Sequence, residues 1–562
     1  MPAADPVVTV DEVAEAYVAA AAALDPVGAT RQGIAGHEAE LTDYSPAGVE
    51  ARAELARRAR HQVLSITAGE ERDQIAADVM VERLTADLDA YEAGEWRRDL
   101  NVLFSPLQQV RESFDLAVTD TAEDWGKLAT RLEAVPHCLA GLRVTLQEGL
   151  AAGTPAARRQ ALACAAQAWA WAGGVNGTPP FFSRLSARYD RRDGAMARRI
   201  DAASGAANAA MGALAQWLVE DYAPAAGDRD GVGAERYELL ARGWNGIDLD
   251  LDDTYRWGWE ELARIEVEMT RVATRIQPGA SLAEVRTLLE TDPARAIEGE
   301  DNLRRWLQDL MDRALTELNG VHFDIPEPLL RLEAMIAPPG GAAAQYYTGP
   351  SEDFRRPGRT WYPTQGRTRF PLWGEVSTAY HEGVPGHHLQ IAMTQFLTDR
   401  LNRFQRTMAF TAGHGEGWAL YAERLMGELG YLANPDHELG MLSAHAMRAV
   451  RVVVDIGLHL ELRIPGDQRF HPGRRWTPEL AATLLAERSS QPLAFVASEV
   501  DRYLGMPGQA ISYKVGERVW LAGREAARRR SGPAFDLRSF HAHALALGPM
   551  GLAELARRLE HC

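Results

Sequence analysis

Cysteine is scarce in this sequence of 562 residues. Only Cys138, Cys164 and Cys562 occur, and none of them belongs to a C-x-x-C pair. A disulfide framework and a zinc site built from thiolates both need closely spaced cysteines, so the sequence indicates neither. We expect buried or incidental thiols at these three positions.

Long apolar runs and an excess of basic charge are also missing. No stretch of the sequence is apolar over the length that a bilayer span requires. Near the start, Asp5, Asp11, Glu12 and Glu15 precede the short run Ala16–Leu24, whereas a secretory signal has a basic start and a longer apolar region. The formal net charge of -18 disfavours nucleic acid or an anionic membrane as the main partner. These absences predict a cytoplasmic protein with no nucleic-acid or membrane partner.

Helix-forming sequence is abundant. In the first two-fifths of the chain, segments rich in Ala, Leu, Glu and Arg repeat their apolar residues every three or four positions. The loop-like stretch Pro224–Gly233 is the best candidate boundary. It divides an N-terminal helical region (1–225) from a catalytic region (226–562), and we expect the two to form one continuous body. The predicted helices cover 48–66, 71–92, 107–118, 120–134, 136–151, 154–172, 183–221, 237–244, 252–276 and 301–319.

The composition changes from about residue 336 onward. Short runs with aromatic and β-branched residues, bounded by Gly and Pro, occur at 345–348, 359–362 and 369–372. Such runs predict strands or extended edges, and therefore a small β-sheet in a mainly α protein. A strand beside a metal-binding helix could pair with the backbone of a peptide substrate.

A histidine-rich motif follows this predicted sheet. His381 and Glu382 stand side by side, and His387 and His388 come six and seven residues after the first histidine. Zinc hydrolases use neutral imidazoles to hold the ion and a free carboxylate to activate its water. In the familiar H-E-x-x-H version the histidines lie four residues apart, but here that position is Pro385. The alternative interpretation is a histidine-rich helix start that contains a turn.

The spacing bears on which histidine would be the second ligand. In a regular helix His388 would lie roughly 10 Å along the axis from His381, which is too far to share one ion. Pro385 and Gly386 favour an interruption of the helix, which would bring His387 to the position of the second ligand. We therefore predict His387 as the ligand and His388 as a neighbour that donates to the ligands' surroundings or to substrate, with His388 the remaining alternative.

Two acidic residues are candidates for the third ligand. Glu416 and Glu423 are seven residues apart and share a helix face with Leu420, so the face is expected to be partly buried. A buried acid needs a partner such as a metal ion. The glycines on both sides of Glu416 permit a close approach, which favours this residue over Glu423. A solvated acidic stripe is the alternative.

Several further residues are candidates for work beside the metal. Arg451, Asp455 and His459 form a line at intervals of four residues, either as a salt-bridged face or as a clamp for a substrate carboxylate. Tyr503 and Tyr513 flank a turn-rich stretch. A tyrosine hydroxyl near the metal could stabilise an oxyanion, although most tyrosines serve packing.

Four of these segments together resemble the bacterial family catalogued as domain of unknown function 885, from the early helices to near the C-terminus. The segments are His381–Gln390, Glu416–Glu423, Asp455–His459 and Pro507–Tyr513. The family is grouped with gluzincin-type metallopeptidases, in which two histidines and a downstream glutamate bind zinc. The resemblance implies that His381, His387 and Glu416 are the ligands and that Glu382 is the general base. The sequence departs from the gluzincin pattern by two extra residues between the histidines, and dipeptidyl peptidase III shows a related stretch with one.

The combined prediction is a mainly α zinc metallopeptidase that hydrolyses short peptides. Glu382, Tyr513 and His459 are its expected catalytic residues, and Arg451 and Tyr503 are expected to bind substrate. Two other functions stay open, a non-catalytic metal-binding scaffold and a zinc amidase with a non-peptide substrate. The free carboxylate of Glu382 argues against the scaffold. The sequence does not distinguish exo- from endopeptidases, and it does not indicate an oligomeric state.

Overall fold

The computed structural model describes residues 8–67, 69–175, 177–337, 344–489 and 491–561. The chain divides into two compact units, and the expectation that they form one continuous body stays a prediction. The first unit contains the chain up to Val232 together with Asp501–Met506, and the second contains Gly233–Val500 together with the chain from Pro507 onward. The boundary after Val232 falls inside the loop-like stretch that the sequence singled out.

The first unit is built from helices. Their order is α1 (Val10–Leu24), α2 (Pro26–Gln32), α3 (Pro46–Leu64), α4 (Glu71–Glu92), α5 (Pro106–Asp115), α6 (Ala122–Ala151), α7 (Arg158–Trp171), α8 (Phe181–Ser186), α9 (Gly194–Trp217) and α10 (Ala223–Ala225).

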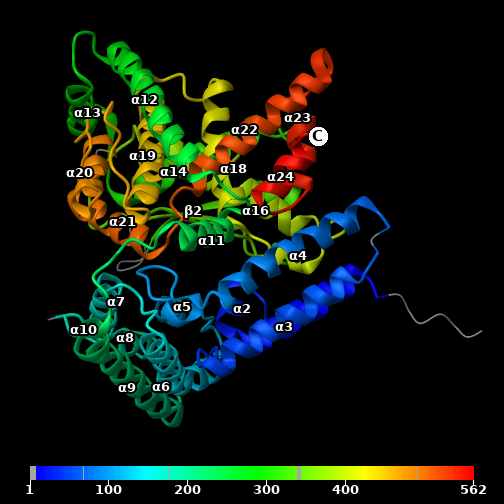
Figure 1. Cartoon of the computed structure of the whole chain (residues 1–562), viewed down its shortest axis with the longest axis vertical. Helices are drawn as coiled ribbons and strands as arrows, with labels where there is room; N and C mark the ends of the chain where they lie inside the picture. The colour runs from blue at the N-terminus through cyan, green and yellow to red at the C-terminus, as the bar shows by residue number, and fades with distance from the viewer. Residues whose placement is uncertain (1–7, 68, 176, 338–343, 490, 562) are drawn as a thin grey trace, which may run out of the picture. The chain divides into compact units, whose positions relative to one another are not determined.

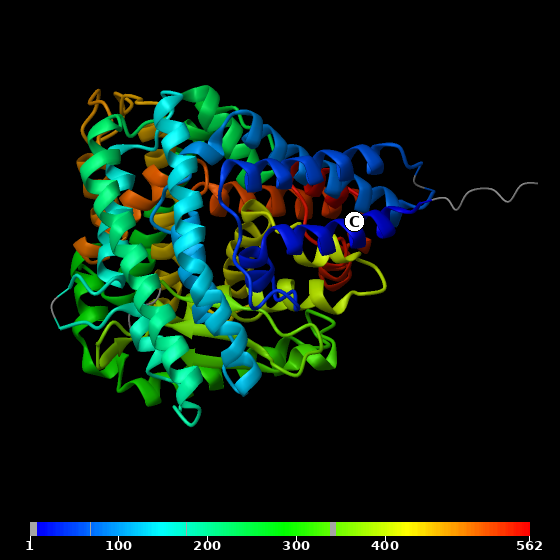
Figure 2. The same ribbon diagram turned by 90° about the horizontal axis from the view of Figure 1, so that it is seen from below.

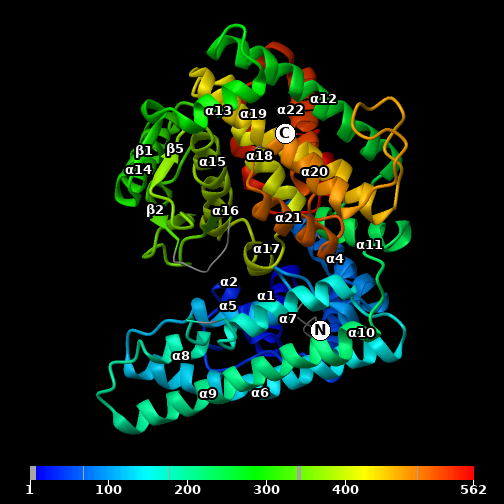
Figure 3. The ribbon, with the colours of Figure 1, turned by 90° about the vertical axis from the view of Figure 1, so that its left-hand side faces the viewer.

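The longest pair, α6 and α9, pack along one another (Figures 2 and 3). The buried seam of α6 includes Leu128, Leu132, Leu139 and Leu146, which recur at helical intervals. This seam continues across Pro136, so one helix forms where the sequence predicted two, 120–134 and 136–151.

The second unit holds most of the remaining helices and all described strands. Its helices are α11 (Ala234–Asn245), α12 (Leu251–Ile276), α13 (Leu282–Thr291), α14 (Glu300–Leu318), α15 (Glu375–Glu382), α16 (His387–Phe396), α17 (Arg403–Thr407), α18 (Ala412–Glu428), α19 (Pro435–His459), α20 (Pro478–Ser489), α22 (Ser512–Ser531), α23 (Leu537–Ala546) and α24 (Leu552–Leu559). Helix α21 (Leu493–Gly505) begins in this unit, and its last residues belong to the first.

Two helix pairs at the centre of the second unit approach closely because small residues lie between them. A Cβ atom on Gly258 of α12 would stand 2.9 Å from the Val452 side chain of α19. Gly417 of α18 faces Gly516 of α22, and a Cβ atom on Gly417 would lie 2.5 Å from the Cα of Gly516. Only glycine permits such backbone contact. The second pair fixes the second turn of α18 against the second turn of α22.

The strands form two small sheets on one side of the second unit (Figure 3). In the larger sheet β4 (Gly358–Tyr362) is central, parallel to β2 (Leu332–Ile336) and antiparallel to β3 (Tyr346–Thr348). The smaller sheet pairs β1 (Ala296–Glu298) with β5 (Arg369–Pro371). Helix α14 packs against β2, and α16 packs against β4. The predicted mainly α fold with a small sheet is confirmed.

The described part of the chain offers no candidate for a transmembrane helix, because none of its helices is both long enough and apolar enough.

Candidate metal centre

The histidine motif is split between two helices. Helix α15 ends at Glu382 and α16 begins at His387, so the predicted interruption of the helix is confirmed. The Gly386 N–H donates to the Tyr380 carbonyl over 3.0 Å. A Cβ atom on Gly386 would stand 2.0 Å from the His381 carbonyl oxygen, so the tight connection requires glycine here.

Trp418 holds this connection from the neighbouring helix α18. Its indole N–H donates to the carbonyl oxygens of Pro385 at 2.8 Å and of Gly386 at 3.3 Å. The side chain is completely buried. Trp418 lies two residues after Glu416, so one short stretch of α18 fixes both the connection and a predicted ligand. The sequence motif contained Trp418 but gave no sign of this bond.

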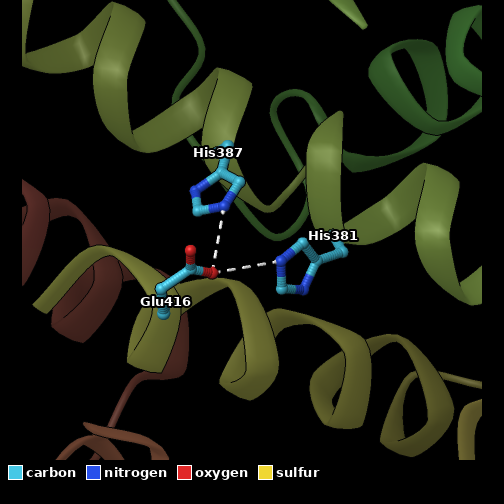
Figure 4. A group of neighbouring side chains, drawn as sticks. All are labelled: His381, His387 and Glu416. Carbon is cyan, nitrogen blue, oxygen red and sulfur yellow. Dashed lines mark ion pairs between the residues drawn. The ribbon is translucent and has the colours of Figure 1, made fainter. Parts of the chain in front are cut away.

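His381, His387 and Glu416 come together in the second unit, as Figure 4 shows. The Nε2 atoms of His381 and His387 lie 3.3 Å and 3.4 Å from the same oxygen, Oε2 of Glu416. One ligand atom from each residue lies within 4.8 Å of the others. Two imidazoles and one carboxylate are the protein ligands of many catalytic zinc sites.

The surroundings of Glu416 Oε2 support a fit to a cation. This oxygen is buried and receives no well-aligned hydrogen bond from any residue in the described ranges. Burial of an unsatisfied carboxylate oxygen is unfavourable, and a bound cation would remove that penalty. The three residues therefore fit an ion of the zinc type.

Glu423 orients the first histidine. Its Oε1 lies 2.8 Å from Nδ1 of His381, it accepts a hydrogen bond from Ser377, and it lies 3.5 Å from a guanidinium nitrogen of Arg448. Burial alone would raise the pKa of Glu423, but Arg448 and the His381 contact lower it to about 2. With Nδ1 held by this carboxylate, the Nε2 atom of His381 faces Oε2 of Glu416. The sequence had led us to expect Glu423 to support the ligands from behind, or else to replace Glu416 as the third ligand.

The pKa values of His381 and Glu416 are shifted from their ordinary values. Burial lowers the pKa of His381, but Glu416 and Glu423 outweigh it and bring that pKa to about 9. The pKa of Glu416 lies well below its ordinary value, because contacts with the two imidazoles outweigh its burial. The cluster therefore favours positive charge at its centre.

Glu382 lies beside the cluster without being one of its three members. Its side chain is buried, and burial raises its pKa, while His381 and His387 oppose that rise. A buried carboxylate with a raised pKa next to a cation site has the properties of a general base.

Tyr513 lies beside His381, and Arg451 packs against the Tyr513 ring. The Tyr513 ring is nearly parallel to the His381 ring, with 6.4 Å between centroids. The guanidinium groups of Arg448 and Arg451 lie 5.5 Å and 4.7 Å from the centre of the Tyr513 ring. Arg451 also pairs with Glu499 over 2.8 Å. The structure thus brings two more of the predicted residues to the cluster.

His388 has a different role from the predicted one. Its Nε2–H donates to the Leu329 carbonyl over 2.8 Å, because a carbonyl can only accept. Nδ1 then accepts from the Tyr347 hydroxyl over 3.0 Å. Burial lowers the pKa of His388 to about 4, so the ring is neutral. It ties α16 to β3 instead of donating to the ligands' surroundings.

His459 lies at the end of α19, and its assignment as a catalytic residue stays a prediction. It lies 11 residues after Arg448 on α19 (459 − 448), or about 16 Å along the helix axis. Its Nε2 lies 3.7 Å from Asp455, whose carboxylate accepts from the Tyr237 hydroxyl at 2.7 Å and the Gly508 N–H at 2.9 Å. A line at i, i+4 and i+8 follows one helix face but also advances along it.

Tyr503 belongs to the first unit, whereas the cluster is in the second. Its side chain is fully buried, and the Arg502 guanidinium lies 4.8 Å from its ring centre. These contacts fit a packing residue, and a role of Tyr503 in substrate binding stays a prediction.

Comparison with known proteins gives a family and a fold. Residues 26–559 match the model of a family described as "Bacterial protein of unknown function (DUF885)". No curated protein matches the sequence.

Two solved structures share the fold over nearly their whole length. One is described as "the putative lipoprotein from Colwellia psychrerythraea", with a TM-score of 0.84, 22% identity and coverage of 99% of both chains. The other, from Shewanella oneidensis, is described as "a putative lipoprotein of unknown function", with a TM-score of 0.72 and 17% identity over 98% of this chain and 100% of that one. At these identities the likeness concerns the fold alone.

Proposed function

The chain belongs to the DUF885 family of bacterial proteins, and we propose that it is a zinc-dependent metallopeptidase that hydrolyses short peptides. The observation that carries the proposal is the convergence of His381, His387 and Glu416, with the separate buried carboxylate of Glu382 beside them. A purely structural metal site has no use for a spare carboxylate of this kind.

Different residues of the chain would bind the metal, transfer the proton and orient the ligands. His381, His387 and Glu416 would hold zinc, which when bound supplies a Lewis acid that polarises a carbonyl and acidifies water. Glu382 accepts a proton from the attacking water and passes it to the leaving nitrogen. Glu423 keeps the His381 ring in its orientation through the 2.8 Å contact with Nδ1.

Tyr513 and Arg451 are the residues closest to a substrate role. Tyr513 stacks on His381, so its ring forms a wall beside the cluster. Its hydroxyl is the candidate donor to the oxygen that gains charge as the carbonyl is attacked. Arg451 lies over the outer face of this ring and is the candidate for polar contacts with the peptide.

Metal analysis followed by a turnover assay tests the proposal. Protein purified without added metal should contain about one zinc ion per chain, as expected for a single three-ligand site. It should then cleave members of a mixed peptide library. A protein that neither contains zinc nor takes it up would overturn the proposal. Zinc uptake without peptide cleavage would redirect it to an amidase with a non-peptide substrate or to a scaffold.

The cytoplasmic location also stays a prediction, and cell fractionation would test it.

A further inference from the structure

A chain of buried polar side chains begins behind the metal centre and leads away from it. Glu423 contacts His381 on one side, and the His445 Nε2 atom lies 3.8 Å from Glu423 Oε2 on the other. The Nδ1 atom of His445 lies 3.6 Å from Glu517 Oε1. Lys514 is paired with Glu517 and lies 2.7 Å from Glu261. The chain therefore links α15, α18, α19, α22 and α12.

His445 is the link between the two carboxylates. It is completely buried, and each of its ring nitrogens faces one carboxylate. Both distances exceed an ordinary hydrogen bond, so packing holds the ring in place. Because Glu423 and Glu517 carry like charge, the ring also sets the spacing between them in a medium of low polarity.

The far carboxylate is firmly anchored. Arg424 donates to Glu517 over 2.8 Å, and the Lys514 side chain is completely inaccessible to solvent. At the near end, Arg448 lies 3.5 Å from Glu423. Cationic side chains thus accompany each carboxylate of the chain, and Arg264 also pairs with Glu261 over 2.7 Å.

Stability alone is a poor reason for such a network. Each buried charge loses its hydration, and apolar side chains of the same volume often stabilise a fold equally well. The network ends at the one carboxylate that orients His381. That end point indicates that the network supports the orientation of His381 in the metal centre.

We infer that His445 is a positioning residue for the metal centre. It braces Glu423 against the anchored Glu517, and Glu423 in turn fixes the ring of His381. The inference rests on the proposed metal site, and it adds residues that neither the motif nor the family resemblance singles out. It predicts that a change at His445, which contacts none of the three ligands in the described structure, weakens metal binding.

The decisive variant is His445→Gln in the full chain. Zinc affinity is measured by competition with a chromophoric chelator, and we expect a loss of about 10–100-fold. The matched control is His541→Gln, since His541 is a buried histidine of the same unit that bonds to the Tyr421 hydroxyl. The control should keep the wild-type zinc affinity. Cobalt-substituted protein adds a second readout, because its visible bands should shift in His445→Gln and not in the control.

The outcomes are separable. If wild-type protein binds no zinc, the proposed function fails. If wild type binds zinc and His445→Gln binds it equally well with unchanged cobalt bands, the inference is overturned. Should His445→Gln not fold, Glu517→Gln replaces it with an expected loss of about 10-fold, at the lower end of such effects. If neither variant folds, the network serves stability and the inference is wrong.

Discussion

Among single residues, Glu382 stands out because it lies beside His381, His387 and Glu416 but is not one of these three candidate ligands. Glu382→Gln keeps the shape of the side chain and removes its ability to accept a proton. We expect the variant to retain zinc while hydrolysis of a peptide substrate falls by about 10²–10⁴-fold. Metal content and initial rates are measured on the same preparation. Loss of zinc, or full activity, would show that the role assigned to Glu382 is wrong.

The two adjacent histidines allow a direct comparison. His387 faces Glu416, whereas His388 bonds to Leu329 and Tyr347. His387→Ala should therefore empty the site, and His388→Ala should retain zinc with a loss of stability from its two broken bonds. Zinc content after dialysis and thermal unfolding of both variants make the measurement. The reverse pattern of zinc contents would contradict the assignment.

Asp99 in the first unit offers a test by pH. Burial, with a contribution from Glu95, raises the pKa of Asp99 to about 7. In the unfolded chain the carboxyl pKa is about 3.9, so the folded protein holds this proton more tightly and loses stability as pH rises from about 4 to 7. Asp99→Asn should thus be more stable than wild type at pH 8, by about 1–3 kcal/mol, and equal to it near pH 4. Denaturant unfolding at both pH values checks this, and an equal difference at both would contradict it.

Sequence reasoning anticipated which residues cluster better than it anticipated the contacts that support them. His387 could be chosen over His388 because Pro385 and its local effect on a helix can be read from the chain. The contacts of Glu423 and His445 depend on how α18, α19 and α22 pack, which no local pattern encodes.

At the level of elements, the contact between α18 and α22 places two parts of the site. Gly417 follows Glu416 directly, and Gly516 lies three residues after Tyr513. Gly417→Ala would force the helices apart, because its Cβ atom would lie 2.5 Å from the backbone of Gly516. We expect a loss of about 1–3 kcal/mol in the free energy of unfolding, together with weaker zinc binding.

Gly427→Ala is the control on the same helix. The nearest atom to its Cβ would be 3.7 Å away on the Leu432 side chain, which is an ordinary contact. This variant should gain about 0.5–1 kcal/mol, since alanine favours a helix interior over glycine. Equal effects of the two substitutions would mean that the close contact between α18 and α22 is not what matters.

Elements themselves were predictable where local pattern and packing agree. The strands near 345–348, 359–362 and 369–372 are confirmed, because aromatic residues between Gly and Pro favour extended backbone. Strand β2 was missed, since Leu332-Glu-Ala-Met-Ile336 consists mostly of helix formers and is extended only because it pairs with β4. Helix α6 crosses Pro136 because its packed seam outweighs a penalty of about 3 kcal/mol.

For the whole molecule, the two units predict an uneven response to metal removal. The proposed site lies entirely in the second unit, so a chelator should lower the unfolding temperature of that unit and leave the first unit unchanged. A ligand at 100 times its Kd adds about 2.7 kcal/mol to the unit that binds it. Calorimetry with and without chelator measures the effect, and Asp99→Asn identifies the transition of the first unit. An unchanged profile would argue against a metal in the second unit.

The path of the chain between the units has a consequence for gene recombination. The polypeptide passes from one unit to the other after Val232, Val500 and Met506. The inserted piece is integral to the first unit, because Asp501 pairs with Arg159 over 3.2 Å and its carbonyl accepts from Gln160 over 2.8 Å. A gene fragment that stops at Val232 would therefore encode an incomplete unit. Because each unit is encoded by two separate stretches of the gene, we expect recombination to preserve both units only when it transfers them together.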